Sequence, residues 1–206
     1  MLPLKEDDTY AVLSEQGMAD GEERGFYRHD TRYLSRYVWK LPGFSLLLSE
    51  TPRPDRLVQH WSRIEGPSQV VGLRRELVLE RGGFRERLEL ENTSLQPQDV
   101  EIALEAAADF MDLFEARGWY TTQRTVTGFS YTAEDGLEVA TRLNITPDSP
   151  GRNWRFALGP KEQARVEVRG AFDSPFHAHG VELPSYEEWA RRFPLHLESG
   201  RSQRVL

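Results

Sequence analysis

One stretch of the chain, residues 73–91, constrains the fold most, because apolar and charged residues alternate on both sides of the glycine pair Gly82-Gly83. A two-residue turn at these glycines would place Leu77 opposite Leu88. In that register most charged side chains share one face and the apolar side chains share the other. The apolar face contains Leu73, Leu77, Leu79, Phe84, Leu88 and Leu90. Because a shift of one residue would mix the two faces, the pattern predicts an antiparallel β-hairpin.

Two charged residues interrupt the apolar face of this hairpin. Arg75 lies on the first strand and Glu86 on the second, and both point to the same side as the leucines. We expect the two opposite charges to form a diagonal ion pair across the hairpin.

Further alternating runs predict more strands, at Leu137–Ile145 and Val166–Phe172. The segments Tyr33–Leu41 and Leu46–Leu48 are interpreted as a second hairpin that turns at Pro42-Gly43. Most of the chain is therefore expected to form antiparallel sheets.

The segment Val100–Phe110 fits two kinds of secondary structure. Its apolar residues alternate as in a strand, whereas its alanines and the spacing of Glu101, Glu105 and Asp109 are typical of a helix. We interpret it as a long strand, because the alternation is regular and the surrounding sequence is rich in β signals.

The C-terminal part has a different pattern. Ser185 and Glu188 match a capping box directly after Pro184, and Pro194 ends the pattern. One helical stripe is formed by Tyr186, Trp189, Ala190 and Phe193. The whole sequence thus predicts an all-β, antiparallel β-sandwich with a short C-terminal amphipathic helix.

Composition excludes several classes of function. The net charge is -7, so a nucleic acid is a poor electrostatic partner. The chain has no cysteine, which excludes disulfides and thiolate sites. Its charged N-terminus lacks the apolar segment of a secretory signal, and no apolar run is long enough to cross a membrane. We expect a cytoplasmic protein without nucleic-acid or membrane partners.

Two longer motifs and a short hairpin pattern connect the chain to a known family. Phe26–Ser35 reads FYRHDTRYLS and 108–118 reads ADFMDLFEARG, with Glu86-Arg87-Leu88 and Asn92 between them. Together these segments resemble the N-terminal domain of bacterial and archaeal glycogen-debranching (amylo-α-1,6-glucosidase) enzymes. The resemblance implies a supersandwich-type β domain that precedes an (α/α)6 barrel carrying the catalytic carboxylates.

This resemblance implies a division of the chain and a function. Residues 1–206 would form a single β-sandwich domain, with 185–206 as a helix and linker leading into a catalytic barrel that the sequence does not contain. The domain would be a non-catalytic module of a glycoside hydrolase that packs against its barrel in cis and could contribute to α-glucan binding. The alternative is a stand-alone β-sandwich interaction protein that binds no carbohydrate.

The segment Asp112–Tyr120 is the best candidate for contact with sugar. Its aromatic residues could offer flat faces to sugar rings, its charged residues could bind hydroxyls, and Gly118 would permit a sharp turn. Phe114 and Trp119 could instead be core residues or cover an interface. Asp30 and Arg32 could also contact substrate, although a structural ion pair is the commoner role of such residues. The candidate carbohydrate-binding residues are Asp30, Arg32, Asp112, Glu115, Arg117, Trp119 and Tyr120.

We assign no catalytic residue, metal or cofactor. Glycoside hydrolysis requires two carboxylates at a fixed separation, and a trio such as Asp109, Asp112 and Glu115 is easily found in a chain with 33 acidic residues. His177 and His179 could share one side of a strand, but without a third ligand nearby we expect no metal site.

Overall fold

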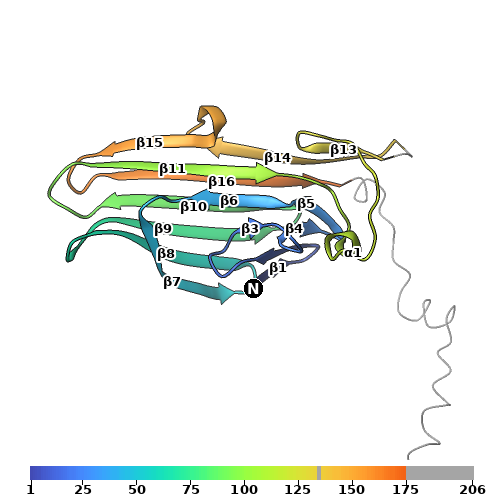
Figure 1. Cartoon of the computed structure of the whole chain (residues 1–206), viewed down its shortest axis with the longest axis horizontal. Helices are drawn as coiled ribbons and strands as arrows, with labels where there is room; N and C mark the ends of the chain where they lie inside the picture. The colour runs from blue at the N-terminus through green and yellow to red at the C-terminus, as the bar shows by residue number, and fades with distance from the viewer. Residues whose placement is uncertain (134–135, 175–206) are drawn as a thin grey trace, which may run out of the picture. The chain divides into compact units, whose positions relative to one another are not determined.

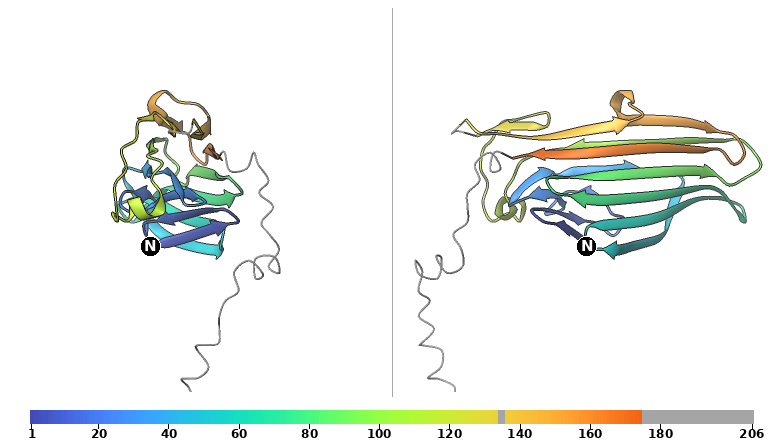
Figure 2. Two further views of the ribbon diagram at one scale, coloured as in Figure 1. Left: turned by 90° about the vertical axis from the view of Figure 1, so that its right-hand side faces the viewer. Right: turned by 180° about the vertical axis from the view of Figure 1, so that it is seen from behind.

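The computed structural model describes residues 1–133 and 136–174, which form three antiparallel sheets. The largest sheet has eight strands in the order β12-β13-β14-β16-β10-β9-β8-β7 (Figure 1). Seen from behind, this sheet lies in front of the other strands (Figure 2). Its strands are β7 (Phe44–Arg53), β8 (Arg56–Glu65), β9 (Ser68–Glu80), β10 (Gly83–Asn92), β12 (Val126–Thr127), β13 (Ser130–Thr132), β14 (Glu138–Thr146) and β16 (Gln163–Asp173).

Two sheets of four strands each complete the described part of the chain. One has the order β15-β11-β6-β3 and the other has the order β1-β2-β4-β5. Their strands are β1 (Leu2–Glu6), β2 (Thr9–Leu13), β3 (Ala19–Asp20), β4 (Gly25–Arg28), β5 (Thr31–Leu34), β6 (Arg36–Lys40), β11 (Gln98–Ala107) and β15 (Asn153–Leu158). The short helices are α1 (Leu113–Ala116) and the 3-10 turn Pro150–Arg152.

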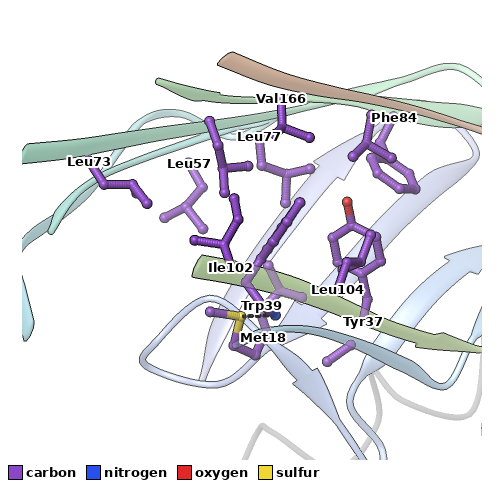
Figure 3. Close-up of a cluster of buried hydrophobic side chains, with 14 of the residues drawn as sticks. Met18, Tyr37, Trp39, Leu57, Leu73, Leu77, Phe84, Ile102, Leu104 and Val166 are labelled. Carbon is purple, nitrogen blue, oxygen red and sulfur yellow. Dashed lines mark hydrogen bonds between the residues drawn. The ribbon is translucent and has the colours of Figure 1, made fainter. Parts of the chain in front are cut away.

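The core lies between the large sheet and the smaller sheets. Figure 3 shows Leu57, Leu77 and Phe84 of the large sheet pointing toward side chains of the opposite layer, which include Tyr37 and Ile102. Alternate residues of each strand are buried, as the period of a strand requires. The predicted all-β sandwich of antiparallel sheets is therefore confirmed.

The central hairpin is confirmed, but its register differs from the expected one. The turn lies at Arg81-Gly82, so Leu77 pairs with Glu86 rather than with Leu88. Gly83 is instead the first residue of β10, where a Cβ would lie 2.1 Å from the carbonyl oxygen of Gly170. The second glycine thus allows close packing of two strands instead of forming the turn.

The predicted faces are nevertheless correct, because a register change of two residues keeps every side chain on its side of the sheet. All six residues of the expected apolar face are buried. Arg75 and Glu86 also form the expected diagonal pair, with 2.6 Å between Nε and Oε1, and both side chains are completely buried.

Groups from β6 and from the loop at Gly17 extend a polar network around this pair. Tyr37 Oη and Trp39 Nε1 donate to Glu86 Oε2 at 2.5 and 2.7 Å. Arg75 Nη1 donates to the carbonyl oxygen of Gly17 at 2.8 Å. Burial and the neighbouring Glu86 carboxylate hold the pKa of Tyr37 well above its usual value. The network therefore connects the large sheet with β6 of the opposite layer.

The segment with two possible structures is a strand, as we expected. It corresponds to β11, which pairs with both β6 and β15. The strand ends at Ala107, before the expected end, and Phe110 has a positive φ of 54°.

The expected hairpin at Pro42-Gly43 is wrong. Its expected first strand, Tyr33–Leu41, is divided at Ser35 between β5 and β6, which belong to different sheets. β6 pairs with β3 and β11, whereas β7 pairs with β8 in the large sheet. The chain therefore passes from one layer to the other at this turn. The hydrogen bonds from Tyr37 and Trp39 to Glu86 of the large sheet stabilise β6 in the facing layer.

Some expectations concern residues outside the described part. These are the C-terminal helix at 185–193, the linker role of 185–206 and the histidines at positions 177 and 179. Among the described residues, no helix is long and apolar enough to span a bilayer.

Candidate functional site

The two sequence motifs at 26–35 and 108–118 lie side by side in the structure. Arg32 N donates to the carbonyl oxygen of Met111 at 2.7 Å, and Leu113 N donates to that of Asp30 at 2.9 Å. Thr31 and Asp112 form an isolated antiparallel bridge. Helix α1 consequently lies beside β5, at one end of the sheets (Figure 1).

Arg32 holds this junction together from inside. It is only 5% exposed and binds Asp109 through two hydrogen bonds, Nε to Oδ1 at 3.1 Å and Nη2 to Oδ2 at 2.5 Å. It also donates to the carbonyl oxygen of Glu22. Burial disfavours its charge, but the hydrogen bonds and charge of Asp109 have the larger combined effect and raise the pKa of Arg32. The guanidinium is thus engaged within the protein, whereas the neighbouring Asp30 is exposed.

Asp112 and Glu115 form the N-terminal cap of α1. Asp112 Oδ1 accepts hydrogen bonds from Phe114 N at 2.8 Å and from Glu115 N at 2.9 Å. In return, Glu115 Oε2 accepts one from Asp112 N at 3.2 Å, which completes a capping box. The spacing Asp-x-x-Glu is visible in the sequence and could have identified this helix start before the structure.

Glu115 also fixes the loop that follows the helix. Its side chain is buried, forms an ion pair with Arg124 and accepts a hydrogen bond from Thr122 N at 2.7 Å. Arg124 Nη1 donates to the carbonyl oxygen of Phe110 at 2.8 Å. Desolvation raises the pKa of Glu115, but its hydrogen bonds, above all with Arg124, lower it overall. The role of Arg124 could not be predicted from the sequence, because nothing in its local pattern indicates a partner nine residues away.

The aromatic residues of this loop face solvent and are not core residues. Trp119 is 71% exposed, Tyr120 48% and Phe114 44%. The rings of Phe114 and Trp119 contact each other with 4.9 Å between centroids. Gly118 has a φ of 76° and makes the sharp turn that the sequence predicted. We call this exposed group of Phe114, Trp119 and Tyr120 the aromatic surface.

Polar contacts hold the aromatic surface in place. Tyr120 Oη donates a hydrogen bond to Asp112 Oδ2, and Trp119 N donates to the carbonyl oxygen of Phe114 at 3.0 Å. The Arg117 guanidinium lies 3.5 Å from the Glu23 carboxylate. The pKa of Asp112 is lowered overall, since its hydrogen bonds with Tyr120 and the helix backbone exceed the effect of desolvation.

The structure thus brings the candidate residues onto two adjoining segments and divides their roles. Arg32 and Glu115 are buried and bind within the protein, and Asp112 caps a helix. Asp30, Arg117, Trp119 and Tyr120 are exposed. Among the described residues, no group of histidine and acidic side chains is arranged to hold a metal ion.

We call residues 112–125, at one end of the sheets, the end loop. The three sheets form an antiparallel β-sandwich domain, and the end loop gives it an exposed aromatic surface. Residues 4–169 match the family described as the N-terminal domain of (some) glycogen debranching enzymes. The chain belongs to this family. A comparison with curated proteins gives no match.

Proposed function

We propose that this domain is the non-catalytic N-terminal module of a cytoplasmic, glycogen-debranching glycoside hydrolase. It packs in cis against an (α/α)6 catalytic barrel, and its aromatic surface contacts the α-glucan substrate. Membership of the family supports the first part of this proposal. The exposed aromatic surface is the observation that supports contact with sugar.

The chemistry of the aromatic surface suits a sugar. The apolar C–H faces of a glucose ring can lie on aromatic rings, while polar groups at the edge fix its orientation. Trp119 and Phe114 supply contacting rings, and Asp30 and Arg117 supply exposed charged groups nearby. An indole that is 71% exposed loses contact with water when a ligand covers it, which favours binding.

The carboxylates of this region support a non-catalytic role. A glycosidase needs a general acid whose pKa is raised and a second carboxylate that is free to act. Here the pKa values of Asp112 and Glu115 are lowered instead. Asp109 is bound by Arg32. None of the three has the properties of a general acid.

Titration of the 206-residue chain with maltohexaose, followed by residue-resolved NMR, tests the proposal. We expect the indole N–H of Trp119 to shift with a Kd of about 1 mM or weaker, because one surface buries little of the ligand. Trp119→Ala should abolish binding while the unfolding midpoint stays unchanged. Leu95→Ala is a matched control, since Leu95 is also highly exposed. An unchanged Trp119 signal at saturating oligosaccharide would overturn sugar binding here.

A further inference from the structure

A hollow is lined in part by residues that follow the aromatic surface directly in the sequence. It lies between the end of the β11 segment, the loop at 122–126 and β13. Its lining includes Asp109, Thr122, Gln123, Arg124, Thr125 and Tyr131. The aromatic surface and the hollow therefore follow one another along a single stretch of chain.

The charges in the hollow are already balanced by internal partners. Asp109 is paired with Arg32, and Arg124 is paired with Glu115. Among the lining residues that the structure describes, an entering ion would therefore meet no unpaired charged side chain. This arrangement favours a neutral ligand over a phosphate or a carboxylate.

Other groups in the hollow are free to bind hydroxyls. Thr122, Gln123 and Thr125 are exposed, and within the described part of the chain their side chains make no hydrogen bond. Glu115 holds the backbone of Thr122, so the segment that carries these side chains is anchored. Threonine hydroxyls and a glutamine amide supply both donors and acceptors, which a sugar hydroxyl requires.

Tyr131 contributes its hydroxyl rather than its ring face. Arg124 lies over the ring, 5.6 Å from the centroid, and Phe110 stacks with it at 6.4 Å. These contacts hold the ring in place. No hydrogen bond of the Tyr131 hydroxyl occurs among residues 1–133 and 136–174.

We propose that this hollow binds one glucose unit of a neutral α-glucan through its hydroxyls, next to the unit that the aromatic surface contacts. The inference rests on the proposed function and adds a second, polar subsite to it. Arg124 is a positioning residue for both parts, because its pair with Glu115 fixes the loop between them.

The same titration, with different reporters, tests this subsite. In the full chain we expect maltohexaose to shift the side-chain amide of Gln123 and the backbone amides of Thr122 and Thr125, together with the Trp119 indole. Gln123→Ala and Tyr131→Phe should each weaken binding about three- to tenfold, as expected for one hydrogen bond. Gln163→Ala is the matched control, because Gln163 is an exposed glutamine on β16.

The outcomes separate the two proposals. If Trp119 shifts but Gln123 and Thr125 do not, and both variants bind like the wild type, the hollow is no subsite and the aromatic surface alone binds sugar. If Trp119 does not shift either, the proposed sugar contact fails and the subsite fails with it. Inorganic phosphate that binds in the hollow more tightly than maltohexaose would contradict the argument for a neutral ligand.

Discussion

Two arginine–glutamate pairs hold different regions of this domain in place. Arg75 and Glu86 lie in the core, and the exposed fraction of both side chains is 0%. Arg124 and Glu115 lie at the end loop, where the arginine side chain is 13% exposed and the glutamate 1%. The first pair lies within the large sheet, and Tyr37 and Trp39 of the opposite layer donate to its Glu86. The second pair connects a short helix with an exposed loop.

This difference shows how similar chemistry can serve the fold in one place and a surface in another. The core network is buried, and Tyr37 and Trp39 both donate to the second oxygen of Glu86. The end network leaves Trp119 and Tyr120 open to solvent while it fixes their backbone. We therefore expect damage to the first pair to affect the whole domain and damage to the second to affect mainly the aromatic surface.

The largest effect is expected for Glu86→Ala. Removing this carboxylate leaves Arg75 charged, buried and without its main partner, which should cost about 3–5 kcal/mol in the free energy of unfolding. Urea denaturation measures this loss. The control is Glu89→Ala, because Glu89 is 36% exposed and its loss should cost about 1 kcal/mol or less. Equal effects of the two variants would remove the basis of the comparison.

Glu115→Ala should have a smaller global effect and a larger local one. It breaks the capping box and the contacts with Thr122 and Arg124, and we expect a loss of about 1–3 kcal/mol. The indole N–H shift of Trp119 should move toward the value of an unstructured peptide. Glu101→Ala is the control, since Glu101 pairs with Arg155 on the surface. A Trp119 signal that stays at its wild-type position would show that Glu115 does not position the loop.

Acid should loosen the end loop. The pKa values of Asp112 and Glu115 are lowered in the folded state, so their stabilising contribution is complete above the usual values of 3.8 and 4.5. That contribution is lost as the pH falls through the lowered values. The Trp119 indole shift should therefore stay constant from pH 7 to about pH 5 and change only below the usual carboxyl range. A transition near pH 6 would contradict the assigned pKa directions.

The smallest expected signal is glucose release by the isolated chain. The isolated chain should release no glucose from branched dextrins above the rate of a blank, because Asp112 and Glu115 have hydrogen-bond partners within the protein that lower their pKa, whereas a general acid needs a raised pKa. A glucose assay on repurified protein measures this. Release that persists through repurification and disappears when the chain is unfolded would contradict the non-catalytic role.

The faces of the strands could be predicted from the sequence, because alternation alone decides which side chains are buried. Arg75 and Glu86 are an example, since their shared face led directly to their pairing. The exact register could not be predicted, because either glycine of Gly82-Gly83 can occupy a turn. Only the contact with Gly170 shows that Gly83 is needed for strand packing.

Contacts between segments far apart in the sequence could not be predicted in the same way. Trp119 and Tyr120 could be identified as candidates because they are aromatic and lie beside Gly118. The contact of their segment with β5, however, depends on the hydrogen bonds between Arg32 and Asp109. No local pattern connects positions 32 and 109. The change of layer at Pro42-Gly43 was missed for the same reason, since a turn signal does not show which sheet the next strand joins.

A map of all backbone amide shifts during maltohexaose titration tests the central claim most directly. We expect shifts confined to residues 114–125, Asp30 and Tyr131. The amides of Arg75 and Glu86 should not respond, because the core network has no open group within reach of a ligand. Shifts centred on the outer face of the large sheet, or none at all, would contradict an α-glucan contact at the end loop.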